Sequence, residues 1–167
     1  THLHTDHVGW NTKLVDGKWV PTFKNAEYIF GQEEWKYTAE QRSNPMYNEF
    51  IADSIQPVID AGLVRFVDVN EQICNEVKRE PTPSHTPGKM SVRSESKGEK
   101  AVITGDFLHH PCQMEEPYWE CSADWDTPMA QKTRVESLGK FADEGLLVFG
   151  THFATPSAGK VIRKGKH

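Results

Sequence analysis

The first eleven residues constrain the fold and the chemistry of this chain more than any other stretch. They contain His2, His4, Asp6 and His7 in the pattern His-x-His-x-Asp-His. Imidazole nitrogens and carboxylate oxygens are the usual protein ligands of zinc and related divalent ions. On an extended strand, His2 and His4 would share a face and bind one ion, and a turn would direct Asp6 and His7 toward a second ion. The pattern predicts a metal site, whereas a single histidine pair would be weak evidence.

Length, charge and cysteine content limit the remaining classes. The chain has 167 residues, so we expect one domain over residues 1–167. Its net charge of -5 gives no reason to expect nucleic acid, and no apolar run approaches the ~20 residues that span a bilayer. The chain has three cysteines, an odd number, and none has the Cys-x-x-Cys spacing. We therefore expect free thiols and a cytoplasmic location, although the sequence also permits a Cys112–Cys121 disulfide.

Beyond the motif, apolar periodicity predicts alternating strands and helices. A helix from Asn44 to Gly62 should kink at Pro57, and a helix should run from Asp126 to about Asp143. We expect the second helix to bury Met129, Val135, Leu138 and Phe141. The expected strands are 26–30, 63–69, 73–79, 90–96, 100–104, 146–149 and 159–163, with turns at 16–17 and 97–98.

Three further candidate ligands, His85, Asp106 and His152, lie in loops or directly after predicted strands. Such positions are where α/β scaffolds gather functional groups. Taken singly, each is as easily structural as functional. Together with the N-terminal motif they complete a set of seven nitrogen and oxygen ligands. His109 and His110 follow Asp106 closely, and a role beside the site and a purely structural role are equally expected for them.

These motifs resemble those of the metallo-β-lactamase-fold hydrolase superfamily, in order and along essentially the whole chain. The matching segments are the N-terminal motif, Ser84-His85-Thr86-Pro87-Gly88, Thr104-Gly105-Asp106 and Gly150-Thr151-His152. The residues around these segments are similar to those in the branch of quorum-quenching lactonases and methyl-parathion-hydrolase-like enzymes. The resemblance implies that His2, His4 and His85 bind one ion and that Asp6, His7 and His152 bind the other. Asp106 would bridge the two ions.

The resemblance also implies a four-layer αββα sandwich within the α/β class. Members carry a first αβ half ahead of the histidine motif, so we expect this chain to be N-terminally truncated and to represent the C-terminal portion of the fold. Strands left without cover would favour a homo-oligomer. The family loop usually reads His-Thr-Pro-Gly-His, and Lys89 here takes the place of the second histidine. Lys89 is not among the ligands, so we expect metal binding to persist.

The function expected from the resemblance is hydrolysis of an ester, lactone or phosphotriester-type small-molecule substrate by a metal-bridging hydroxide. Two ions ~3.5–4 Å apart lower the pKa of a shared water to about 7. Asp106 would hold the ions, and Asp6 would accept or return a proton at the leaving group. Zinc suits imidazole and carboxylate ligands best, with iron, manganese or cobalt as alternatives. The competing hypotheses are a thiolester hydrolase of the glyoxalase II type and a non-catalytic metal-binding fragment that needs a partner.

Overall fold

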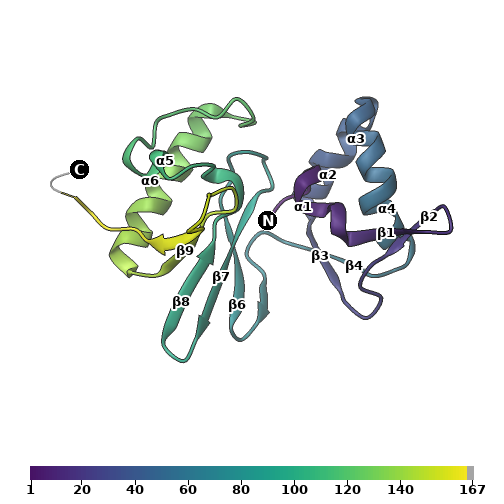
Figure 1. Cartoon of the computed structure of the whole chain (residues 1–167), viewed down its shortest axis with the longest axis horizontal. Helices are drawn as coiled ribbons and strands as arrows, with labels where there is room; N and C mark the ends of the chain where they lie inside the picture. Colours follow the sequence, from purple (N-terminus) through teal and green to yellow (C-terminus); the bar gives the residue numbers. More distant parts are fainter. Residues whose placement is uncertain (165–167) are drawn as a thin grey trace. The chain divides into compact units, whose positions relative to one another are not determined.

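A computed structural model describes residues 1–164 and divides the chain into two units (Figure 1). The N-terminal unit is His2–Asp68, and the C-terminal unit comprises Thr1 and the chain from Val69 onward. Both mix helices with strands, so the predicted α/β class is confirmed. The expectation of one domain over residues 1–167 stays a prediction. No helix in the described part of the chain is long and apolar enough to cross a membrane.

The second half of the N-terminal motif is helical, where the sequence predicted a turn, and His4 directly before it has extended backbone. Helix α1 is Thr5–Val8, and a 3-10 turn, η1, follows at Gly9–Asn11. The His7 amide donates to the His4 carbonyl at 3.0 Å and closes the first turn. Leu3 and Val8, five positions apart, are both buried in the core. Burying both requires the chain to coil between them, which an alternating strand would not do.

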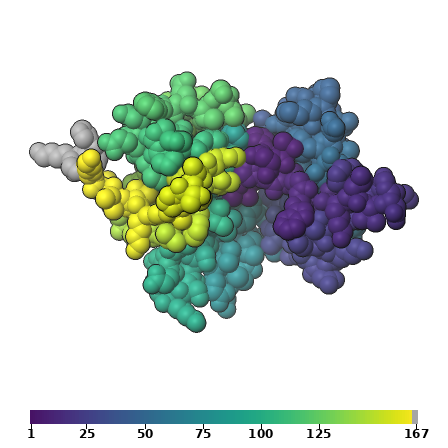
Figure 2. Space-filling model, in the orientation of Figure 1, coloured from purple at the N-terminus to yellow at the C-terminus, as the bar shows by residue number. Residues whose placement is uncertain are grey.

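Two short sheets complete the N-terminal unit. Strands β1 (Thr12–Val15) and β2 (Lys18–Pro21) form an antiparallel hairpin around the predicted turn at Asp16 and Gly17. Both turn residues have positive φ, 49° and 74°, as this tight connection requires. Strand β3 (Tyr28–Gly31) pairs in parallel with β4 (Val64–Val67). In Figure 2 the hairpin is part of the purple surface. The side chains of Trp10, just before β1, and Trp19, in β2, are exposed.

Helices connect β3 to β4 and supply the core of this unit. The helix predicted from residue 44 is interrupted before Pro57, as expected, because proline lacks the amide that would continue the hydrogen bonding. Its apolar face buries Phe50, Ile51, Ile55 and Val58 against Tyr28 and Phe30. The segments in order are α2 (Gln32–Glu40), η2 (Gln41–Ser43), α3 (Pro45–Phe50), a π-helical turn η3 (Ile51–Ile55) and α4 (Gln56–Asp60).

The C-terminal unit is built on a six-stranded sheet with strand order β10-β9-β8-β7-β6-β5. All neighbours are antiparallel except β8 and β9, which are parallel. The single strand predicted over residues 73–79 is wrong, because Cys74 pairs with Val77 and the polar residues between them form a hairpin turn. The strands are β5 (Gln72–Cys74), β6 (Val77–Pro81), β7 (Met90–Ser96), β8 (Glu99–Ile103), β9 (Leu147–Phe149) and β10 (Ala158–Lys160). The last is shorter and earlier than the predicted 159–163.

Helix α6 (Thr127–Glu144) packs on this sheet through Leu138 and Phe141, which contact Val102 and Val148 (Figure 1). Its N-cap is Asp126, whose side chain accepts from the Met129 amide at 2.8 Å, as the sequence predicts. The predicted burial of Met129 and Val135 is wrong, since 36% and 38% of these residues are exposed. The buried face instead includes Ala130 and Arg134, in step with Leu138 and Phe141.

The segment between β8 and α6 is largely irregular, as predicted. It contains only a 3-10 turn, η4 (Gly105–Phe107), and one turn of helix, α5 (Cys112–Glu115). Phe107 and Leu108 are fully buried in the core of this unit, so the segment is anchored at its start. This anchoring fixes the backbone directly after Asp106.

Candidate metal centre

Three histidines of the N-terminal motif form one cluster. The ring centroids of His2 and His4 lie 4.7 Å apart, and those of His2 and His7 lie 4.2 Å apart. His2 is buried, whereas the Asp6 side chain is about half exposed, with one oxygen 3.3 Å from His7 Nε2. Gathering imidazoles at this density has no packing advantage over apolar side chains. The cluster therefore offers a group of nitrogen donors of the kind that bind divalent metal ions.

Two buried side chains from neighbouring helices hold this cluster. Glu34 of α2, only 2% exposed, accepts the Leu3 amide at 3.0 Å and fixes the backbone between the first two histidines. Tyr47 of α3 places its hydroxyl 3.3 Å from His4 Nε2. Burial, then the neighbouring Tyr37 and Glu34, raises the pKa of Tyr47, so its hydroxyl stays protonated at neutral pH.

Asp106 is the centre of a second cluster, in the C-terminal unit. It lies in η4 directly after β8 and is 2% exposed. Its oxygen Oδ2 lies 2.9 Å from His152 Nε2, 3.7 Å from His85 Nε2 and 3.6 Å from His109 Nε2. Three imidazoles therefore surround one buried carboxylate oxygen. The structure brings the predicted residues His85, Asp106 and His152 together and adds His109.

The turn before Asp106 depends on a glycine. Gly105 has a φ of +58°, and a Cβ at this position would lie 2.7 Å from the Thr1 side chain. The preceding Thr104 accepts through its carbonyl from the ammonium of Lys89 at 2.7 Å. Lys89, 1% exposed, also donates to Thr82 Oγ1 at 3.0 Å and lies over the Phe107 ring. Lys89 thus supports the Asp106 turn through the Thr104 backbone.

The pair His109 and His110 is divided by the structure. His109 lies in the cluster, with its ring stacked on that of His152 at 5.5 Å between centroids. His110 points elsewhere, and its Nδ1 accepts from the Cys112 amide at 3.1 Å. A role beside the site is therefore supported for His109, and a local structural role for His110. Cys121 Sγ lies 3.9 Å from His109 Nε2, and the cysteines are free thiols.

Two buried charges in this cluster were missed by sequence reasoning. Asp124 lies 3.6 Å from His85 Nδ1, on the side of the ring away from Asp106. Arg134 of α6 is fully buried and lies 3.4 Å from the other Asp124 oxygen. A signal for Arg134 is visible in the sequence, because it interrupts the helical stripe of Ala130, Leu138 and Phe141. Nothing in the sequence distinguishes Asp124 from a loop acid.

The donor sets of both clusters fit divalent metal ions. Each offers several imidazole nitrogens with at least one carboxylate, which suits zinc, iron, manganese or cobalt. In the C-terminal unit, ligand atoms of His85, Asp106 and His109 all lie within 4.8 Å of one another. His4 Nε2 lies 3.3 Å from the Tyr47 hydroxyl and His85 Nδ1 lies 3.6 Å from an Asp124 oxygen, which are neighbours of the kind that metal-bound histidines usually have.

Comparison with known proteins identifies the family. A sequence model of the metallo-beta-lactamase superfamily matches residues 1–152, so the chain belongs to this superfamily. A probable metallo-hydrolase of Bacillus subtilis (strain 168), YybB, is 27% identical over 111 residues, which cover 65% of this chain and 43% of that protein. The resemblance found in the motifs is therefore confirmed.

Solved structures agree on the fold. The hydrolase AbOPH of the beta lactamase superfamily superposes with a TM-score of 0.86 at 27% identity. The match covers 98% of this chain and 58% of the AbOPH chain. AidC, a dizinc quorum-quenching lactonase, superposes with a TM-score of 0.73 at 23% identity. The match covers 87% of this chain and 54% of the AidC chain. At that identity AidC supports the fold alone. The chain spans about half the length of these relatives.

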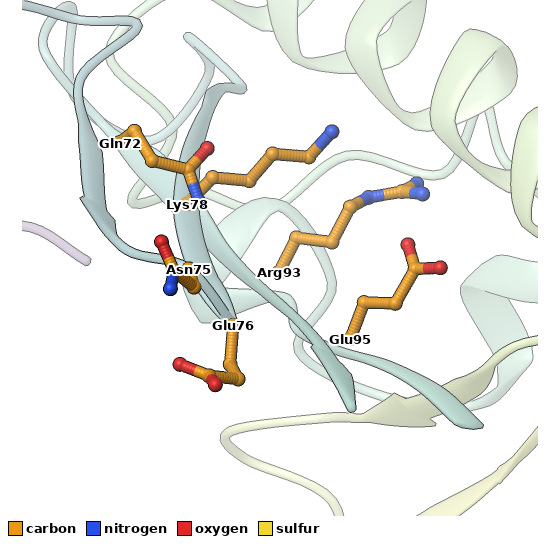
Figure 3. A pocket seen from close by; sticks show the side chains of 6 residues that line it. All are labelled: Gln72, Asn75, Glu76, Lys78, Arg93 and Glu95. Atoms are coloured by element: carbon orange, nitrogen blue, oxygen red, sulfur yellow. The ribbon is translucent and has the colours of Figure 1, made fainter. Parts of the chain in front are cut away.

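A separate pocket on the C-terminal unit has different chemistry (Figure 3). It has a volume of about 400 Å³ and lies over β5, β6 and β7. Its charged groups neutralise one another, and Arg93 is already paired with Glu80 at 2.9 Å. No histidine or cysteine lines it, so it offers no catalytic group of the kind found in the clusters. The lining residues are Gln72, Asn75, Glu76, Lys78, Arg93 and Glu95.

Proposed function

We propose that this chain is a metal-dependent hydrolase that cleaves an ester, lactone or phosphotriester-type bond. The observation that supports the proposal most is the convergence of three imidazole nitrogens within 3.7 Å of the buried Asp106 oxygen. Membership of a superfamily that includes hydrolases and lactonases adds to it. The ester or lactone class is favoured because the residues flanking the ligands are similar to those of the lactonase branch.

The ligand assignment extends over both clusters. We propose that His2, His4 and His85 hold one divalent ion, that Asp6, His7 and His152 hold the other, and that Asp106 bridges them. The order of these residues along the chain is that of the superfamily motifs. The ions would supply Lewis-acid polarisation of the substrate and a water acidic enough to ionise near pH ~7. Zinc is the proposed metal, with iron, manganese or cobalt as alternatives.

The chain's own side chains then have distinct roles. Tyr47 orients the His4 ring through Nε2, and Glu34 holds the backbone of the motif. Asp6 is about half exposed, so its carboxylate is accessible to solvent and can take up a proton and return it to the leaving oxygen. The buried Asp106 has no such access and serves as a fixed anionic ligand. Exposed aromatic residues of the segment before α6, Tyr118, Trp119 and Trp125, are proposed to contact an apolar part of the substrate.

Metal content and turnover test this proposal on the full chain. The zinc- or cobalt-loaded protein should hold two ions and hydrolyse at least one of N-hexanoyl-homoserine lactone, an aryl ester and an aryl phosphotriester. Asp106→Ala should lose at least one ion and reduce turnover more than about 100-fold, since partners outside the ligand set alone contribute ~10–100-fold. Asp143→Ala, which removes an exposed carboxylate paired with Arg163, is the matched control.

Each outcome has a defined meaning. Turnover of a thiolester alone would replace the proposed substrate class with that of a thiolester hydrolase. Two bound ions without turnover of any substrate would favour a metal-binding module. An Asp106→Ala protein with unchanged metal content and rate would contradict the bridging role.

A further inference from the structure

Arg134 is the most completely buried charge of the C-terminal unit, and its contacts converge on the Asp106 cluster. Its Nε donates to the carbonyl of Phe107, the residue after Asp106, at 2.9 Å. One terminal nitrogen donates to the carbonyls of Pro117 and Trp119 at 2.8 and 2.9 Å. The other lies 3.4 Å from Asp124 Oδ2. A guanidinium can only donate, so every group around it must accept.

Asp124 connects this arginine to His85. The Asp124 side chain is 1% exposed, its Oδ2 faces Arg134, and its Oδ1 lies 3.6 Å from His85 Nδ1. The His85 side chain is 5% exposed, so water does not compete freely for this contact. An ionised carboxylate can only accept, which favours the His85 tautomer that has its proton on Nδ1. Asp106 favours a proton on Nε2 in the same way at 3.7 Å, so the two carboxylates compete for the ring proton until an ion takes Nε2.

We infer that Asp124 is a positioning residue, held by Arg134, that fixes the tautomer and ring orientation of His85 for metal binding. The inference rests on the proposed function, in which His85 is a ligand. A carboxylate behind a metal-bound imidazole also increases the basicity of the ligand nitrogen. A role limited to anchoring the loop before α6 would explain the Arg134 contact but would not require Asp124 to face Nδ1.

Asp124→Asn separates the two roles. The asparagine keeps the size of the side chain, but its two ends differ. Because Arg134 can only donate, the amide oxygen should turn toward Arg134 and the NH₂ group toward His85 Nδ1. That group donates, so the proton of His85 is forced onto Nε2, the nitrogen that must bind the ion. Loop anchoring is largely preserved, whereas the tautomer that has its proton on Nδ1 is disfavoured.

Asp126→Asn is the matched control. Asp126 lies two positions away and caps α6 by accepting from the Met129 amide. Asparagine caps a helix about as well as aspartate, so this variant changes the same charge without disturbing α6. Asp126 has no contact with His85 among those the structure describes.

The first measurement is the tautomer of His85 in the metal-free full chain, by long-range ¹H–¹⁵N NMR at a pH about two units above the ordinary histidine pKa of ~6.5. The wild type and Asp126→Asn should have the same share of the tautomer that has its proton on Nδ1, and Asp124→Asn should have a much smaller share. An Asp124→Asn protein that keeps the wild-type share would overturn the inference.

The second measurement is Co²⁺ affinity by competition with a chelating dye. Asp124→Asn should bind Co²⁺ 10–100-fold more weakly than the wild type, with Asp126→Asn unchanged. Equal losses in both variants would overturn the positioning role. His85→Ala tests the proposed function separately. If it keeps wild-type Co²⁺ affinity while Asp124→Asn lowers the share of the Nδ1 tautomer, the ligand assignment fails and the Asp124–His85 interaction stands.

Discussion

The two ligand clusters are built in opposite ways. In the N-terminal unit the ligands are nearly consecutive, and a single helical turn that starts at Thr5 gathers them. In the C-terminal unit His85, Asp106 and His152 come from three separate loops, and buried charges, Arg134, Asp124 and Lys89, hold those loops. Consecutive ligands need little support, because the backbone already links them. Ligands from distant loops each pay conformational entropy, so their loops need strong fixed contacts.

Removing the buried Arg134 should cause the largest difference in stability between the two units. Arg134→Met removes a donor from the carbonyls of Phe107, Pro117 and Trp119 and removes the positive charge beside the buried Asp124. Breaking a buried pair in this way costs about 3–5 kcal/mol. Hydrogen exchange should show the loss in the C-terminal unit, with β3 and β4 of the N-terminal unit unchanged. Arg163→Met removes an exposed pair and should cost less than about 1 kcal/mol. Equal losses in the two arginine variants would remove the basis of the comparison.

Glu34, the buried charge beside the N-terminal cluster, should contribute less to stability than Arg134 does in the C-terminal unit. Glu34→Gln keeps an acceptor for the Leu3 amide but removes its charge. A hydrogen bond to a charged group contributes about 1.5–3 kcal/mol against about 1 for a neutral one, so the expected loss is about 1–2 kcal/mol. Exchange of the amides in α1 and α2 should report it. A loss as large as that of Arg134→Met would show that both clusters depend on buried charge alike.

This contrast also explains what the sequence predicts and what it does not. The N-terminal motif is visible because its ligands are adjacent, and the turn expected after His4 is the short helix α1. The predictions of turns at Asp16-Gly17 and Lys97-Gly98 are confirmed. Such turns need positive φ angles, which depend on the two residues themselves and not on distant parts of the chain. Asp124, Tyr47 and Glu34 were missed because a buried polar partner looks like any surface acid or core aromatic until the fold is known. The family resemblance supplied the grouping of His85, Asp106 and His152, which spacing alone leaves open.

Tyr47→Phe tests how finely the N-terminal cluster is oriented. The change removes the hydroxyl near His4 Nε2 and leaves the ring packed in the core. We expect Co²⁺ affinity to fall about 10-fold, equivalent to about 1.4 kcal/mol, with little loss of stability. Tyr118→Phe, on an exposed residue of the C-terminal unit, should leave the affinity unchanged. An unchanged affinity in Tyr47→Phe would mean that adjacent ligands need no orienting partner.

The smallest loss of stability is expected at acidic pH, and it should again occur in the C-terminal unit. Burial by itself raises the pKa of Glu80, but hydrogen bonds and charge from Lys140 and Arg93 lower it overall. A hydrogen bond from Arg93 is the main cause that lowers the pKa of Glu144. A carboxyl whose pKa is lowered on folding stabilises the fold above its unfolded pKa of ~4.3, and this contribution disappears as the pH falls through the folded pKa. Protection of β6, β7 and β8 against exchange should therefore decrease between about pH 5 and pH 3, relative to β3 and β4.

Arg93→Met should remove most of this pH dependence, because Arg93 contacts both carboxylates. The effect is small because these carboxylates are partly exposed and water screens the pairs. Arg163→Met, which breaks an exposed pair on the same unit, should keep the wild-type pH dependence. If Arg93→Met keeps the wild-type pH dependence as well, the acid response comes from other carboxylates.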